Sequence, residues 1–211
     1  MSNAIQAVDA LINSFDENKE LASAITTVLE SNETFLFKLK NFDNHFAKHP
    51  SHANIQEYAF DLMMVHHLDN NNDDEEYFES KEWQDIEDKT LDRGSELLNM
   101  LLYVTEVNDD DVQINIEDFL YEFLLVDEDE FQDEHRIYEE LIANVDLIDE
   151  NINSIVEVAK RLPDELEIRE LFVPLMLFFK NPEAREVNPA YFENITREEY
   201  ALLTALLTYA N

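Results

Sequence analysis

The sequence has a single glycine, Gly94, in 211 residues, and it has no cysteine. Glycine supplies the positive φ angles of tight hairpin turns and the bare backbone that cradles phosphate groups. A sheet of tight hairpins, a dinucleotide-binding glycine motif and a phosphate-binding loop are therefore disfavoured together. The absence of cysteine removes disulfides, thiolate-bound zinc, iron–sulfur clusters and a cysteine nucleophile.

Basic residues are also scarce, because the chain has 14 Lys and Arg against 49 Asp and Glu, a net charge of −35. Residues 61–150 contain 31 acidic and 4 basic residues, which gives −27, whereas residues 1–60 and 151–211 each carry −4. An acidic adaptation for solubility alone would spread its charge evenly. The strongly acidic central region 61–150 is predicted to make no direct contact with nucleic acid or with an anionic membrane.

No long apolar run is present. The longest extends from Leu171 to Phe179, and a membrane span needs roughly 18 apolar residues. The first residues, MSNAIQAVDALINSF, lack the basic and apolar regions of a signal peptide. We therefore expect a cytoplasmic protein without a membrane partner.

The residues that are abundant indicate helices. Apolar side chains recur at helical spacing, as in Ile5, Val8 and Leu11, and Thr196 with Glu199 matches the capping box of a helix start. We predict an all-α fold in which residues 1–211 form one domain, a single irregular bundle of about nine or ten helices. A short α-solenoid-like array of helix pairs is the alternative. Gly94 would mark a break or a close backbone contact.

Three acidic clusters stand out within the central region. They are Asp73, Asp74, Glu75 and Glu76; Asp109, Asp110 and Asp111; and Asp127, Glu128, Asp129, Glu130, Asp133 and Glu134. None has the glycine that an EF-hand calcium loop needs. Our leading hypothesis is a non-enzymatic interaction protein in which these clusters bind a basic protein partner, as in a nucleic-acid mimic, an immunity-type inhibitor or an adaptor. Carboxylates on adjacent helical turns lie about 5–6 Å apart, comparable to the roughly 7 Å between phosphates of a nucleic-acid strand.

Other roles for the acidic residues stay open. They could act only as a solvated surface on a scaffold or a homo-oligomer subunit, where the charge provides solubility. They could also cap helix N-termini, where the helix dipole favours carboxylates.

Histidines offer a different chemistry. His45 and His49 are four residues apart, which places both imidazoles on one helix face, and His66 and His67 lie on the next predicted helix. The alternative function is therefore a metal-binding helical bundle or a metal-dependent hydrolase. The spacing lacks the glutamate of a His-Glu-x-x-His motif, and Lys48 disfavours a cation. We accordingly assign no catalytic residue, metal or cofactor, and name His45, His49 and His66 as the candidate ligands.

Overall fold

The computed structural model describes residues 2–71, 75–110, 112–125 and 137–211, without the side chain of Glu75. In these ranges the chain has no strand and nine helices of seven or more residues, which confirms the predicted all-α multi-helix fold. The α-helices are α1 (Asn3–Phe15), α2 (Lys19–Glu30), α3 (Phe35–Ala47), α4 (Gln56–Asp69), α5 (Glu75–Phe78), α6 (Lys81–Thr90), α7 (Leu97–Asp109), α9 (Glu139–Ala143), α10 (Ile152–Ala159), α11 (Arg169–Lys180) and α12 (Arg197–Ala210). Short 3₁₀ segments are η1 (Pro50–Ile55), η3 (Val145–Asp149) and η4 (Pro189–Glu193), and η2 (Asp118–Phe123) is a π-helix.

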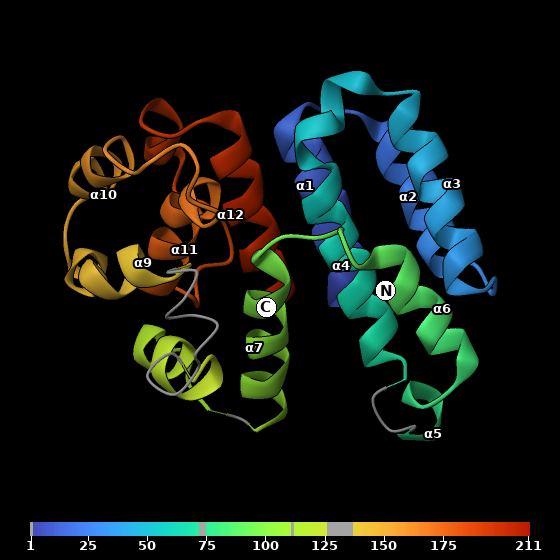
Figure 1. The fold of residues 1–211 in the computed structure, drawn as a ribbon. Coiled ribbons are helices and arrows are strands. Elements are labelled where there is room, and N and C mark those ends of the chain that lie inside the picture. The colour runs from blue at the N-terminus through green and yellow to red at the C-terminus, as the bar shows by residue number, and fades with distance from the viewer. Residues whose placement is uncertain (1, 72–74, 111, 126–136) are drawn as a thin grey trace.

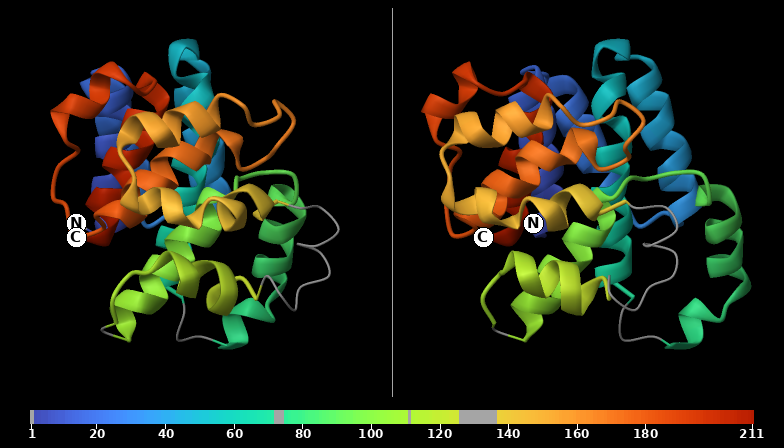
Figure 2. Two further views of the ribbon diagram at one scale, coloured as in Figure 1. Left: turned by 90° about the vertical axis from the view of Figure 1, so that its left-hand side faces the viewer. Right: turned by 60° about the vertical axis from the view of Figure 1, so that its left-hand side comes forward.

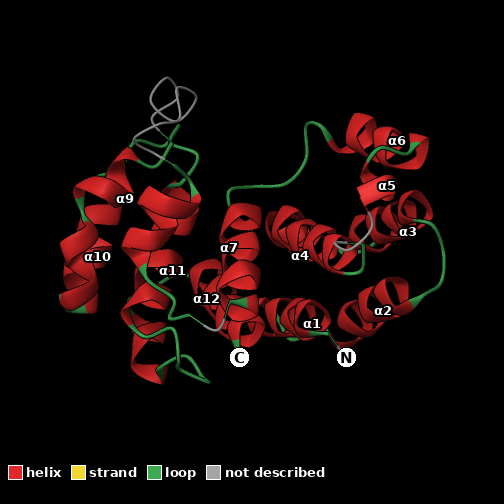
Figure 3. Ribbon diagram, turned by 90° about the horizontal axis from the view of Figure 1, so that it is seen from below, coloured by secondary structure: helices red, strands yellow, loops and turns green. Residues whose placement is uncertain are grey.

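Four helices, α1, α4, α7 and α12, form the centre of the molecule. Helix α1 packs against α4 and α12, and α7 packs against the same two helices, so the four close into a ring (Figure 3). Helices α2 and α3 lie on one side of this centre, and α9, α10 and α11 lie on the other, beyond α12 (Figure 1).

The first and last helices pack antiparallel. Asn3 Nδ2 donates to the carbonyl oxygen of Tyr209 at 2.9 Å, and at the other end Arg197 pairs with Asp16 at 3.7 Å. The two chain ends consequently lie next to each other (Figure 2). This closure differs from a solenoid, in which each repeat contacts only its neighbours.

Burial follows the hydrophobic pattern of each helix. Residues 58–65 of α4 and 171–179 of α11 are buried on every face, whereas α1 and α2 bury one face each. Pro174 is accommodated inside α11, which begins five residues earlier. The capping box of α12 is confirmed, because Thr196 Oγ1 accepts from Glu199 N at 3.1 Å and Glu199 Oε2 accepts from Thr196 N at 2.6 Å. No helix in the described ranges combines the length and apolarity needed to cross a bilayer.

Arg93 clamps the connection between α6 and α7 to both α3 and α4. Its Nη1 donates to both carboxylate oxygens of Asp43 at 3.0 and 3.2 Å, and its Nη2 donates to Glu57 at 3.3 Å. Its guanidinium carbon lies 4.5 Å from the centre of the Phe60 ring. The cation is therefore committed to Asp43 and Glu57.

Gly94 and Ser95 complete this clamp. Gly94 has a φ of 92°, and a Cβ there would lie 2.7 Å from Oδ1 of the fully buried Asp61, so the predicted close contact is confirmed. Ser95 donates to Asp61 from its backbone N–H, at 3.2 and 3.1 Å, and from its hydroxyl at 2.6 Å. Because Leu97 N in turn donates to Ser95 Oγ at 3.2 Å, the clamp fixes the start of α7.

Candidate acidic binding pocket

The structure describes part of the predicted acidic clusters. Asp109 is the last residue of α7 and Asp110 follows it, and both are exposed, as is Glu76 of α5. Glu75 begins α5. The other predicted residues, Asp73, Asp74, Asp111, Asp127, Glu128, Asp129, Glu130, Asp133 and Glu134, lie outside the described residues.

We expected acidic residues to cap helix N-termini, but Asp109 and Asp110 lie at a helix C-terminus. They stand at the C-terminus of α7, where the partial negative charge of the helix dipole disfavours a carboxylate. Burial raises the pKa of Asp69, and the negative charge of Asp109 raises it further. These two carboxylates therefore do not stabilise α7 as caps.

A pocket with a volume of about 310 Å³ opens between α7 and the π-helix η2. We call it the acidic pocket, and its lining residues are Tyr103, Glu106, Val107, Asp110, Val112, Asp118, Glu122 and Phe123. Its apolar floor includes the buried Tyr103 and Val107, while Glu106, Asp110 and Glu122 are exposed at the rim. No basic side chain lines this pocket in the part of the chain that the structure describes.

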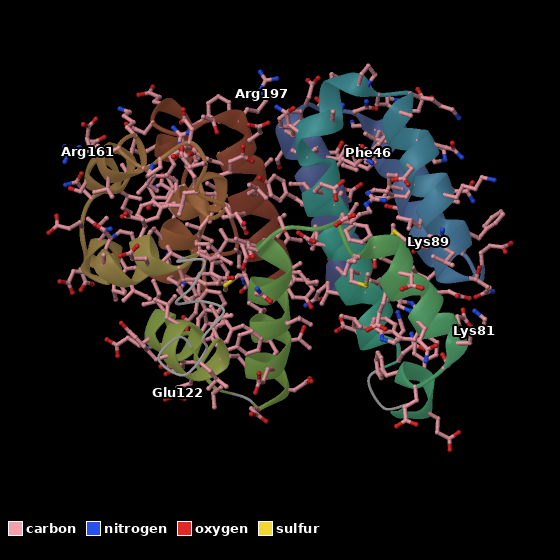
Figure 4. All side chains as sticks on the ribbon, in the orientation of Figure 1. Phe46, Lys81, Lys89, Glu122, Arg161 and Arg197 are labelled. Carbon is pink, nitrogen blue, oxygen red and sulfur yellow. The ribbon has the colours of Figure 1, made fainter. Side chains whose placement is uncertain are left out.

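The π-helix holds one wall of the acidic pocket. Leu124 N donates to Phe119 O at 3.1 Å, the bond from residue i+5 to residue i that defines a π-turn. The rings of Phe119 and Phe123 stack with centroids 6.2 Å apart, and both contact the Tyr103 ring, at 5.3 and 5.6 Å. The side chain of Glu122 extends from this wall (Figure 4). The wide turn thus places two aromatic rings inward and leaves a carboxylate outward.

The pKa of Tyr103 is sensitive to the negative charges of the acidic pocket. Its hydroxyl donates to Asn115 O and accepts from Asn115 N, both at 2.8 Å, which ties the segment after α7 back onto that helix. Burial raises the pKa of Tyr103, and the negative charges of Asp118, Glu122 and Glu106 raise it further. Three carboxylates from two elements therefore act together on one buried phenol.

Sequence reasoning missed Glu106, Asp118, Glu122 and Tyr103 as site residues. A signal was present, because Glu106 with Asp110 and Asp118 with Glu122 are both acidic pairs four residues apart. Such a pair places two like charges on one helix face and is unfavourable in isolation.

The candidate histidine ligands lie at opposite ends of two antiparallel helices. His45 and His49 are at the C-terminal end of α3, where His49 Nδ1 contacts His45 O at 2.8 Å. His66 lies near the end of α4, where its Nδ1 is 3.1 Å from Ser2 Oγ. An antiparallel neighbour brings only the start of α4 near the end of α3, because each residue advances a helix by about 1.5 Å. The described residues contain no group of three His, Asp or Glu side chains arranged for a metal.

His66 and His67 instead line a second pocket, of about 750 Å³, which we call the histidine cleft. Lys38 of α3 and Tyr77 of α5 are among its other lining residues. Burial lowers the pKa of His66, as does the nearby Lys38, while Glu30 opposes them.

The chain matches no known family model, and neither the curated proteins nor the solved structures include a match to it. Its function must therefore be inferred from the geometry of its own residues.

Proposed function

We propose that the protein is a non-enzymatic interaction protein that binds a basic segment of a partner protein, with the acidic pocket receiving a lysine or arginine side chain. The observation that carries this proposal is the pocket itself, in which four carboxylates surround an apolar floor without a basic side chain among its lining residues. Lysine and arginine have the complementary form, since each carries a cationic head on an apolar stem.

Two of the four basic residues in the central region support this proposal by their positions. Lys81 pairs with Asp85 at 2.8 Å within α6, and Arg93 pairs with Asp43 and Glu57. Neither cation lines the acidic pocket. Neither of these two cations therefore occupies the carboxylates of the pocket.

The arrangement of the central region also supports a directional interaction. Residues 75–90, 97–110 and 112–125 lie along the lower side of the molecule in the orientation of Figure 1. At the C-terminus of α7, the helix dipole adds to the negative field of Asp109 and Asp110. A basic partner would be attracted toward this side over about a Debye length and would then bury an apolar stem on Tyr103 and Val107.

A direct test measures the affinity for a short labelled peptide of alternating arginine and glycine, by fluorescence anisotropy at several salt concentrations. Three substitutions, Glu106→Gln, Asp118→Asn and Glu122→Gln, are combined in one variant. We expect its affinity to be at least about tenfold lower than that of the unaltered protein, because each lost charge pair contributes on the order of 0.5–1 kcal/mol. The dependence of affinity on salt should also become shallower.

A matched control removes the same charge elsewhere. Glu165, Glu186 and Glu193 are exposed outside the acidic pocket, and the combined change of all three to Gln leaves the pocket intact. This control should lower the peptide affinity by less than about threefold. If both variants lose affinity equally, the net charge alone attracts the peptide and the pocket assignment is wrong.

A further inference from the structure

The hairpin formed by α5 and α6, residues 75–90, lies beside α3 and α4 (Figure 3). Its aromatic side chains contact His67 of α4. Trp83 of α6 stacks on His67 of α4, with the rings 11° from parallel and 6.4 Å apart. Phe78 meets Trp83 edge to face at 5.1 Å, and Ile86 is fully buried. The hairpin is thus attached to the central helices by a small aromatic and apolar contact.

His67 lies at the junction of four helices. Its ring centre is 4.6 Å from that of Phe35 of α3, and its Nε2 is 2.8 Å from the hydroxyl oxygen of Tyr77 of α5. A neutral imidazole with its proton on Nδ1 accepts the Tyr77 hydrogen bond at Nε2. Every contact of the ring with the hairpin is therefore compatible with the uncharged form.

We propose that His67 is a pH-sensitive latch, whose neutral ring holds the α5–α6 hairpin closed and whose protonation releases it. This device is independent of the acidic pocket and goes beyond the function proposed above.

The groups that face His67 oppose its protonation. Lys38 of α3 is held at the histidine cleft by donating to Leu29 O at 2.8 Å, and His66 is the neighbouring residue on α4. Burial, then Lys38 and His66, lower the pKa of His67 to about 4. Three carboxylates, Glu30, Glu33 and Glu82, line the same cleft. Glu30 acts on His66, and Glu82 of α6 acts on the Tyr77 hydroxyl.

The sign of the effect follows from this pKa. The closed hairpin binds a proton on His67 less readily than an open hairpin, in which the ring is less buried and its pKa lies closer to the ordinary 6.5, while Lys38 and His66 stay beside it. Closure is therefore fully favoured above pH 6.5 and weakens as the pH falls toward 4. Between pH 7 and pH 5 the equilibrium constant for opening should rise, with about 20-fold as the upper limit.

Hydrogen exchange measures this opening. After correction for the intrinsic exchange rate, the amides of α6 should lose protection between pH 7 and pH 5, by up to about 20-fold. The amides of α11, a helix buried far from the hairpin, provide the internal reference and should change much less. Loss of protection in all helices together would indicate global destabilisation and would overturn the latch.

Two variants identify the responsible side chain. His67→Gln keeps an acceptor for Tyr77 but does not titrate, so the protection of α6 should become independent of pH. His66→Gln, the matched control, should keep the pH dependence. If His67→Gln fails to fold, the unaltered protein is followed by NMR, where the imidazole signals of His67 and the indole signal of Trp83, the single tryptophan, must change with one midpoint. Different midpoints, or a persisting pH dependence in His67→Gln, would reject the proposal.

Discussion

Among single residues, Asp61 combines complete burial with an ionisable group. Its carboxyl accepts three hydrogen-bond contacts from Ser95, yet burial raises its pKa to about 8. The folded protein therefore binds a proton at Asp61 more tightly than the unfolded chain does. The stabilising contribution of Asp61 is fully present below its ordinary pKa of 3.8 and is lost as the pH rises toward 8.

Asp61→Asn should remove this pH dependence. In the protonated form the contact between Asp61 Oδ2 and Ser95 Oγ reverses, and the carboxyl donates to the hydroxyl oxygen. The asparagine reproduces this form, because its Oδ1 can accept from Ser95 N and its amide can donate to Ser95 Oγ. In urea unfolding between pH 5 and pH 7, the unaltered protein should lose up to about 1.4 kcal/mol per pH unit relative to the variant. Equal slopes for the two proteins would show that Asp61 is ionised in the fold.

At the scale of elements, α7 and η2 build the acidic pocket in a way that disfavours their own stability. Glu106, Asp109 and Asp110 crowd the C-terminal turns of α7, and Leu125, which follows η2, has a positive φ of 47° without being glycine. Crowded like charges and a non-glycine residue with a positive φ both cost stability and are held in place by the surrounding structure. Such costs are frequent at functional sites.

Removing the charge at the end of α7 should therefore stabilise the protein. Asp109→Asn and Asp110→Asn relieve the unfavourable interaction with the helix dipole, and the first also relieves repulsion with Asp69. Each should raise the free energy of unfolding by about 0.3–1 kcal/mol. Glu198→Gln, in the first turn of α12, is the opposite control and should lower it by a similar amount. Thermal unfolding measures both changes, and destabilisation by both aspartate variants would contradict this account.

The sequence predicted the helices that depend on local signals. The apolar stripe of α1 and the capping box of α12 act within one helix, so they can be recognised without knowing the partner helix. Gly94 was recognised as special because a positive φ or a close backbone contact is the usual reason for an isolated glycine.

The acidic pocket could not be predicted in the same way. Its wall is a π-helix, whose i+5 bonding changes which side chains share a face, whereas pattern recognition assumes 3.6 residues per turn. The contact between His67 and Trp83 depends on how the α5–α6 hairpin returns to α4, which no local spacing encodes. The single-domain prediction remains a prediction.

For the whole molecule, the net charge of −35 has two effects. Repulsion among the acidic residues destabilises the fold, and their negative field attracts a basic partner. Salt screens both interactions. The two consequences of salt should therefore have opposite signs.

We expect the unfolding temperature to rise by about 5 °C between low salt and about 0.3 M sodium chloride, because screening relieves the repulsion in the fold. The affinity for the arginine–glycine peptide should fall over the same range. Calorimetry and anisotropy measure the two quantities, and an equal osmolality of sucrose controls for effects of excluded solute. An unfolding temperature that falls with salt would show that attractive ion pairs dominate the fold.

The antiparallel pairing of α1 with α12 has a consequence for folding during synthesis. A ribosome delivers α1 first and α12 last, so the apolar face that α1 presents to α12 lacks its final cover until synthesis of α12 is complete. Contacts between such distant parts of a chain slow folding, because a long loop must close before they form. We therefore expect the nascent chain to expose this apolar face until α12 is added, while its acidity repels neighbouring nascent chains.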